Sequence, residues 1–99
     1  MADVFYDPKV FGSLTVADTA IGFPDADILS GDKEAKMVTI SSEDAASRFR
    51  IDGGDPTTTV GHLLNSDVYI EIEGINAVRK FRAIRTTATS AKLKYTLYF

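Results

Sequence analysis

Strict alternation of apolar and polar residues is the feature that most constrains how this chain can fold. At the C-terminal end, Leu93, Tyr95, Leu97 and Phe99 occupy every second position, and lysine, threonine or tyrosine fills the positions between them. A period of two residues is the period of a β-strand, whose successive side chains point to opposite faces of a sheet. The segment 91–99 is therefore predicted to be a strand with one buried face, and its apolar end is expected to tuck into a sheet.

Shorter stretches of the same kind predict further strands upstream. Strands are expected at 13–16, 36–40, 46–51, 67–73 and 78–85. In the last of these, Ile84 falls out of phase, which indicates a bulge or a strand buried on both faces. No segment has the period of an amphipathic helix, and residues 25–29 are compatible only with a single helical turn.

The spacing of the predicted strands indicates the fold class. Turn signals recur at intervals of about 8–12 residues, as is typical of β-sandwiches and barrels. With 99 residues the chain is expected to form one domain. We predict an all-β fold, a single antiparallel β-sandwich of jelly-roll type with its core in residues 36–99. Residues 1–35 are irregular and are expected to form an N-terminal arm and loop with short strands, packed on the domain or swapped with a neighbouring copy.

Composition excludes several classes of function. The chain has no cysteine, which removes disulfides, thiolate nucleophiles and zinc–thiolate sites. A net charge of −3 argues against nucleic acid as a partner, because phosphate binding needs a concentrated positive surface. No apolar run approaches the ~18 residues that span a membrane, and the acidic N-terminus lacks the pattern of a signal peptide. We expect a cytoplasmic protein that is not an enzyme and needs no cofactor.

The segment RFRIDGGDPTTTVGHLL, from Arg48 to Leu64, contains the chain's one histidine and its sharpest turn. His62 lacks the second His or Cys that a metal site would use, so it is expected to be a turn residue that bonds to local backbone or packs its ring. The Asp-Gly-Gly-Asp-Pro sequence predicts a rigid turn, because glycine supplies unusual φ, aspartate caps and proline fixes the exit. Calcium prefers oxygen donors, so the candidate metal ligands are Asp52, Asp55 and Asp67, although their spacing lacks the ladder of an EF-hand.

Basic residues are concentrated in two of the predicted strands. The cluster consists of Arg48, Arg50, Arg79, Lys80, Arg82 and Arg85. Cross-strand ion pairs with Glu71 and Glu73 are the simplest explanation. A charged contact with another protein is the alternative.

The order of these motifs resembles a known group of proteins. Residues 48–64 follow the pattern [aromatic/Arg]-R-x-D-G-x-x-P-T-x-x-x-G-x-x-L. An acidic-aliphatic strand at 68–73, an F-x-A-I-x motif at 81–85 and a closing strand rich in Leu and Tyr at 92–99 come next. Over residues 36–99 this arrangement resembles small proteins encoded in the structural-gene region of tailed phages and prophages. The first 35 residues depart from the pattern, and the group has no catalytic residues to carry over.

The resemblance implies a virion protein, assembled in the host cytoplasm, that decorates or cements the capsid. It would bind the outer surface of the shell of major capsid protein as a homotrimer or another ring. A head–tail connector or tail component is the alternative within that class. A carbohydrate- or host-surface-binding β-domain, using Tyr69, Tyr98 and the loop 52–55, is the alternative of another class. The candidate protein contacts are Phe5, Tyr6, Phe11, Phe23, Arg48, Arg50, Thr58, Tyr69, Arg82 and Arg85.

Overall fold

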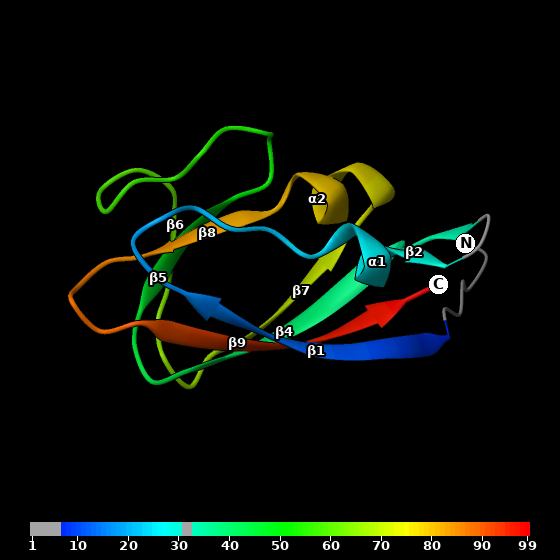
Figure 1. The fold of residues 1–99 in the computed structure, drawn as a ribbon, viewed down its shortest axis with the longest axis horizontal. Coiled ribbons are helices and arrows are strands. Elements are labelled where there is room, and N and C mark those ends of the chain that lie inside the picture. The colour runs from blue at the N-terminus through cyan, green and yellow to red at the C-terminus, as the bar shows by residue number, and fades with distance from the viewer. Residues whose placement is uncertain (1–6, 31–32) are drawn as a thin grey trace.

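The computed structural model describes residues 7–30 and 33–99, which fold into antiparallel sheets with two short helices (Figure 1). The larger sheet has the order β1 (Pro8–Val16), β9 (Ala91–Tyr98), β4 (Met37–Glu43) and β7 (Tyr69–Glu73). The smaller sheet has the order β6 (His62–Leu64), β5 (Ser47–Arg50) and β8 (Arg82–Arg85). The remaining elements are α1 (Asp25–Ile28), the paired strands β2 (Leu29–Ser30) and β3 (Lys33–Glu34), and α2 (Ile75–Lys80).

The order of the strands is similar to that of a jelly roll. Ile21 forms an isolated antiparallel bridge with Ala83, in which each backbone N–H donates to the other carbonyl at 2.9 Å. This bridge adds the segment around Ile21 to the open side of β8. The two sheets then have the orders β1-β9-β4-β7 and Ile21-β8-β5-β6, which is the connectivity of two Greek keys wound together. The predicted all-β, antiparallel fold is confirmed.

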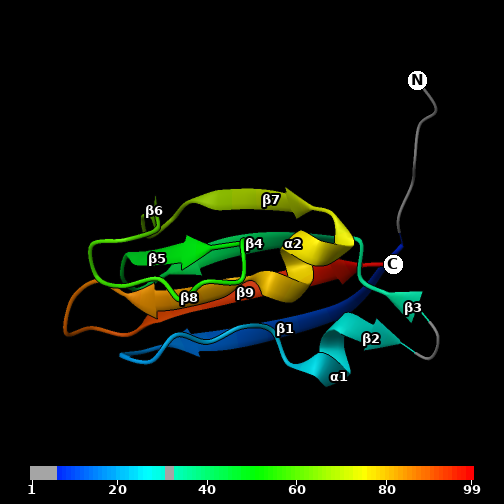
Figure 2. The ribbon, with the colours of Figure 1, turned by 90° about the horizontal axis from the view of Figure 1, so that it is seen from above.

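The core lies between the two sheets. On β9 the residues at every second position from Ala91 to Leu97 are buried, as the alternation predicted. From the other side comes Phe81, fully buried, whose ring stacks on Phe23 at 4.7 Å and on Phe49 at 5.6 Å between centroids. The smaller sheet covers one end of the larger sheet, whereas α1, α2 and the β2–β3 hairpin lie toward the other end (Figures 1 and 2).

Two predictions for the N-terminal region can be compared with the structure. The strand expected at 13–16 begins earlier, and β1 pairs with β9 from Pro8 to Val16 with one irregularity between Pro8 and Val10. This part of the predicted arm is therefore an edge strand packed on the domain. The single helical turn expected near residues 25–29 is confirmed as α1.

The predicted strand at 78–85 is wrong in its first half. Residues Ile75–Lys80 form the helix α2, and the strand begins only at Arg82. Gly74 adopts a φ of 111°, where a side chain would be strained, and starts the turn that buries Val78. The pairing of β5 with β8 is regular, so Ile84 marks no bulge, and it lies half-buried opposite Arg48. Within the described ranges no helix is long and apolar enough to cross a membrane.

Candidate functional site

An apolar groove of about 480 Å³ separates the free edges of the two sheets. The strands on its two sides, β6 and β7, follow one another in the chain but belong to different sheets. The groove is lined by Phe49, Ile51, His62, Leu63 and Leu64 on the side of the smaller sheet, and by Val68, Ile70, Glu71, Ile72 and Glu73 on the other side. Seven of these ten residues are apolar, which is the usual lining of a binding site.

The alternation of β7 explains how the groove is built. Ile70 and Ile72 face inward, and Ile72 is only 8% exposed. At the rim, however, apolar side chains remain open to solvent: Leu63 is 51% exposed, and Ile51 and Val68 are each 38% exposed. Burial of such a side chain is favourable by about 1.5–3 kcal/mol when it is complete. A partner that covers the rim would gain part of this free energy.

Three polar side chains accompany the apolar lining. The imidazole of His62 packs against Phe49, with ring centroids 5.4 Å apart, which confirms the prediction that its ring packs. His62 belongs to the strand β6 and not to a turn. Glu71 and Glu73 are exposed on β7, and neither takes part in the two ion pairs found among the described residues. The groove therefore has an acidic border.

A second hollow of about 360 Å³ adjoins the groove at Ile51 and His62 and extends to Arg50 and Asp52. The Arg50 guanidinium donates to both oxygens of Asp52, from Nε at 3.0 Å and from Nη2 at 2.7 Å. The Gly54 N–H donates to the same carboxylate at 3.2 Å. These hydrogen bonds lower the pKa of Asp52 to about 2. The Asp52 carboxylate is therefore occupied by hydrogen bonds within the turn.

The rest of the loop is held from inside the chain. Arg48 donates from Nε to the Thr58 carbonyl and from Nη1 to the Gly61 carbonyl, both at 3.0 Å. The Thr57 hydroxyl accepts from the Val60 N–H at 2.9 Å. These contacts are those of a structural connection, and they tie the loop to β5 at the side of the groove.

The candidate calcium ligands do not form a common site. Asp52 is held by Arg50, and Asp67 lies in a turn with a φ of 65°, where its N–H donates to the Ser42 carbonyl at 2.7 Å. Across residues 7–30 and 33–99, no three His, Cys, Asp or Glu side chains converge as a metal site requires. The grouping of Asp52, Asp55 and Asp67 is therefore wrong.

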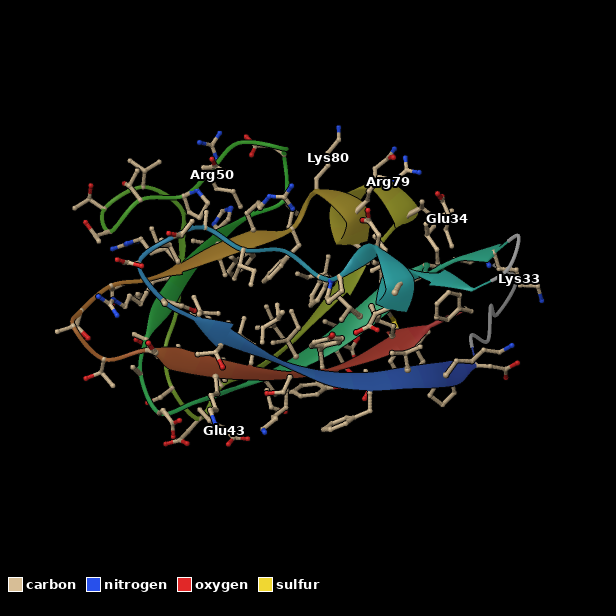
Figure 3. All side chains as sticks on the ribbon, viewed as in Figure 1. Lys33, Glu34, Glu43, Arg50, Arg79 and Lys80 are labelled. Carbon is tan, nitrogen blue, oxygen red and sulfur yellow. The ribbon has the colours of Figure 1, made fainter. Side chains whose placement is uncertain are left out.

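The basic residues are arranged differently from the prediction. Arg50 and Arg82 are directly opposite one another on β5 and β8, so two like charges share the outer face of the smaller sheet. The expected ion pairs with Glu71 and Glu73 are wrong, because β7 belongs to the larger sheet and pairs with β4. Arg79 instead forms an ion pair with Glu34 (Figure 3). Figure 3 also shows Arg50, Arg79 and Lys80 on one side of the molecule and Glu43 on the opposite side.

The candidate contact residues are distributed over several surfaces. Phe11 on β1 and Tyr69 on β7 are 71% and 59% exposed, so both rings are accessible. Phe23 was expected at a contact but is 7% exposed, because its ring stacks on Phe81 in the core. Thr58 is exposed in the loop, and Arg82 and Arg85 are partly exposed on β8. Phe5 and Tyr6 lie outside the described residues.

Sequence reasoning missed the groove itself. Its signals were present as two apolar segments, Leu63–Leu64 and the alternating strand from Val68 to Ile72, on either side of a turn. The pairing that leaves both strands at free edges could not be read from them. No known protein family, curated protein or solved structure matches the chain.

Proposed function

We propose that the protein is a virion structural protein that binds the outer surface of a capsid shell as a decoration or cement protein. The motif order over residues 36–99 motivates the class. The observation that carries the proposal is the apolar surface exposed on a small all-β domain, with Ile51, Leu63 and Val68 at the groove and Tyr69 next to it. Contiguous exposed apolar residues are typical of surfaces that bind another protein.

The arrangement of the polar side chains supports a binding role. Arg48, Arg50 and Asp52 hold the loop 51–61 in place, so the groove has a rigid border on that side. A preformed surface loses little conformational entropy when a partner binds. A decoration protein needs such a surface for the major capsid protein and another for its own copies, and we propose that it assembles as a homotrimer or another ring. Exposed Phe11, on the opposite edge of the larger sheet, is suited to the second contact.

Shell binding tests the proposal directly. Under this proposal a major capsid protein is encoded near the gene of this chain, and shells assembled from it are mixed with the purified protein and sedimented. We expect co-sedimentation that saturates at a copy number comparable to that of the capsid protein, together with an oligomer by light scattering. A strict monomer that stays in the supernatant would refute the proposal. Saturation at a single ring for each shell would instead support the connector.

The carbohydrate-binding alternative is weighed by where its residues lie. Tyr69 and Tyr98 belong to the larger sheet, whereas the loop 52–55 follows β5 of the smaller sheet. Neither the groove nor the adjoining hollow includes either tyrosine. A glycan site made from these three elements therefore has no observation in its favour, and capsid binding is the function that we propose.

A further inference from the structure

The groove is bordered by two strands that each lack a neighbour on one side. β7 pairs with β4 from Tyr69 to Glu73, and β7 ends the larger sheet. β6 pairs only with β5 and ends the smaller sheet. Figure 2 shows β7 at one side of the larger sheet, with β1 at the other. A free strand edge presents unpaired N–H and C=O groups and is a template for one more strand.

The side chains of β7 define which strand would fit. Ile70 and Ile72 point inward, and Tyr69, Glu71 and Glu73 alternate with them, with the two glutamates at the border of the groove. A strand added along β7 would alternate in the same way, with every second side chain in the groove. Its other side chains would lie beside the two glutamates, where a basic residue makes a favourable cross-strand pair.

We propose that this groove binds an extended segment of a partner protein, in which apolar and basic residues alternate, by adding it as a strand to β7. The segment matches β7 in length, from Tyr69 to Glu73. Its apolar side chains cover Leu63 and Val68, and its lysines or arginines pair with Glu71 and Glu73. The inference rests on the proposed function only for the identity of the partner, which would be the capsid protein.

A second copy of β7 is a poor occupant of the groove. In antiparallel self-pairing that keeps the isoleucines inward, one register places Glu71 opposite Glu71. Of the two registers shifted by one pair, one places Glu71 opposite Glu73, and the other pairs each Glu71 with Tyr69. Two of these three registers therefore set an acid opposite an acid, and directly opposed like charges are destabilising. The edge strand β1 of a second copy is also unsuitable, because its apolar residues Leu14 and Val16 are already buried in its own core.

Short blocked peptides test the chemistry of the occupant. The first probe is Lys-Val-Lys-Val-Lys. The second has the same composition with the valines and lysines in separate blocks, and the third has glutamate in place of each lysine. We expect the alternating lysine peptide to bind at least about tenfold more tightly than either control, with amide shift changes concentrated in β6 and β7. Equal binding of the three peptides, or shift changes confined to β5 and β8, would overturn the inference.

Matched variants test the site. Ile51 and Ile75 are both isoleucines that are 38% exposed, but only Ile51 lines the groove. Ile51→Asn should weaken binding of the alternating lysine peptide about tenfold, whereas Ile75→Asn should leave it unchanged. Glu71→Gln should weaken binding and reduce its dependence on salt, and Glu43→Gln is the control on the same sheet. Urea unfolding of each variant excludes loss of fold, and equal effects of Ile51→Asn and Ile75→Asn would refute the assignment.

The two proposals fail in different ways. If the alternating peptide binds but the protein does not bind capsid shells, strand addition at the groove is supported and the capsid function is wrong. If shells bind Ile51→Asn as well as the unmodified protein and the peptides do not bind, the groove is wrong and the capsid function stands. A concentration-dependent dimer with protected β7 amides, formed by the unmodified protein alone, would identify a second copy as the occupant and overturn the inference.

Discussion

Substitution of Gly12 by alanine tests how the edge strand β1 is held on the larger sheet. Gly12 lies directly opposite Tyr95 in the β1–β9 register, and the phenol ring covers it. A Cβ added at Gly12 would overlap Oη and Cζ of Tyr95 and would lie 2.9 Å from Cε2. An aromatic residue that covers a glycine on an edge strand is a known way of stabilising such a strand. The glycine is required here by close approach, because its backbone is not in the left-handed region.

The ring has no free space into which it could move. Tyr95 is 2% exposed, packs against Phe23 with centroids 4.8 Å apart, and donates a hydrogen bond from its hydroxyl to Asp27. Overpacking of a core costs about 1–3 kcal/mol, and the gain from replacing glycine in a strand is at most about 1 kcal/mol. We therefore expect Gly12→Ala to lower the free energy of unfolding by about 1–2 kcal/mol. In a domain of this size that corresponds to a fall of roughly 4–16 °C in Tm.

A double-mutant cycle in urea gives the decisive measurement. In a Tyr95→Leu background the ring is gone, so Gly12→Ala should cost nothing or should stabilise the protein slightly. The coupling free energy between the two sites is expected to be about 1–3 kcal/mol. Ser13→Ala, at the neighbouring exposed position, is the control and should change stability by less than ~0.5 kcal/mol. If Gly12→Ala lowered the free energy of unfolding equally in both backgrounds, the overlap with the Tyr95 ring would not be the cause, and the explanation would be refuted.

Three further predictions concern polar groups. Tyr95→Phe removes the hydrogen bond to Asp27 and should cost about 1–2 kcal/mol in urea. Burial and the hydrogen bond to Asp27 raise the pKa of Tyr95 above 10.0, which an absorbance titration would show. The contribution of Tyr95 to stability is therefore fully present below pH 10 and is lost as the pH rises through the raised pKa of the folded protein. Ser47→Ala should raise stability by up to about 1 kcal/mol, because the fully buried hydroxyl has no partner among the described residues; a loss of stability would contradict this. Since Arg50 holds the pKa of Asp52 at about 2, NMR should show the carboxyl titrating near pH 2, and Arg50→Gln should return it toward 3.8. The contribution of the Arg50–Asp52 pair to stability is present above pH 3.8 and is lost as the pH falls toward 2.

The long strands were predictable from the sequence because burial on one face leaves a period of two. β9 shows this best, since its buried face continues without a break from Ala91 to Leu97. α2 was not predictable in the same way, because six residues make fewer than two helical turns and give too few positions to define a period. The helix depends on one local feature, the positive φ of Gly74, and on one tertiary feature, the burial of Val78.

The groove was less predictable than the strands that build it. A strand's sequence specifies which of its faces is apolar, but its place in the sheet depends on pairings far along the chain. β4 shows this, since it pairs with β9 on one side and with β7 on the other. Arg48 is a similar case: its alternation indicated an outward side chain, yet its partners, the carbonyls of Thr58 and Gly61, exist only once the loop has folded.

The acids on β7 unite two requirements that otherwise conflict. An exposed strand edge beside an apolar groove favours aggregation, and proteins commonly place charges on such edges to prevent it. Glu71 and Glu73 meet this requirement, because two of the three registers of β7 with its own copy that keep the isoleucines inward oppose like charges. The same carboxylates attract a strand whose outward residues are basic. Specificity of this kind depends as much on rejecting the wrong partner as on binding the right one. In our proposal, the two glutamates keep the groove open in the free protein and select the strand that closes it.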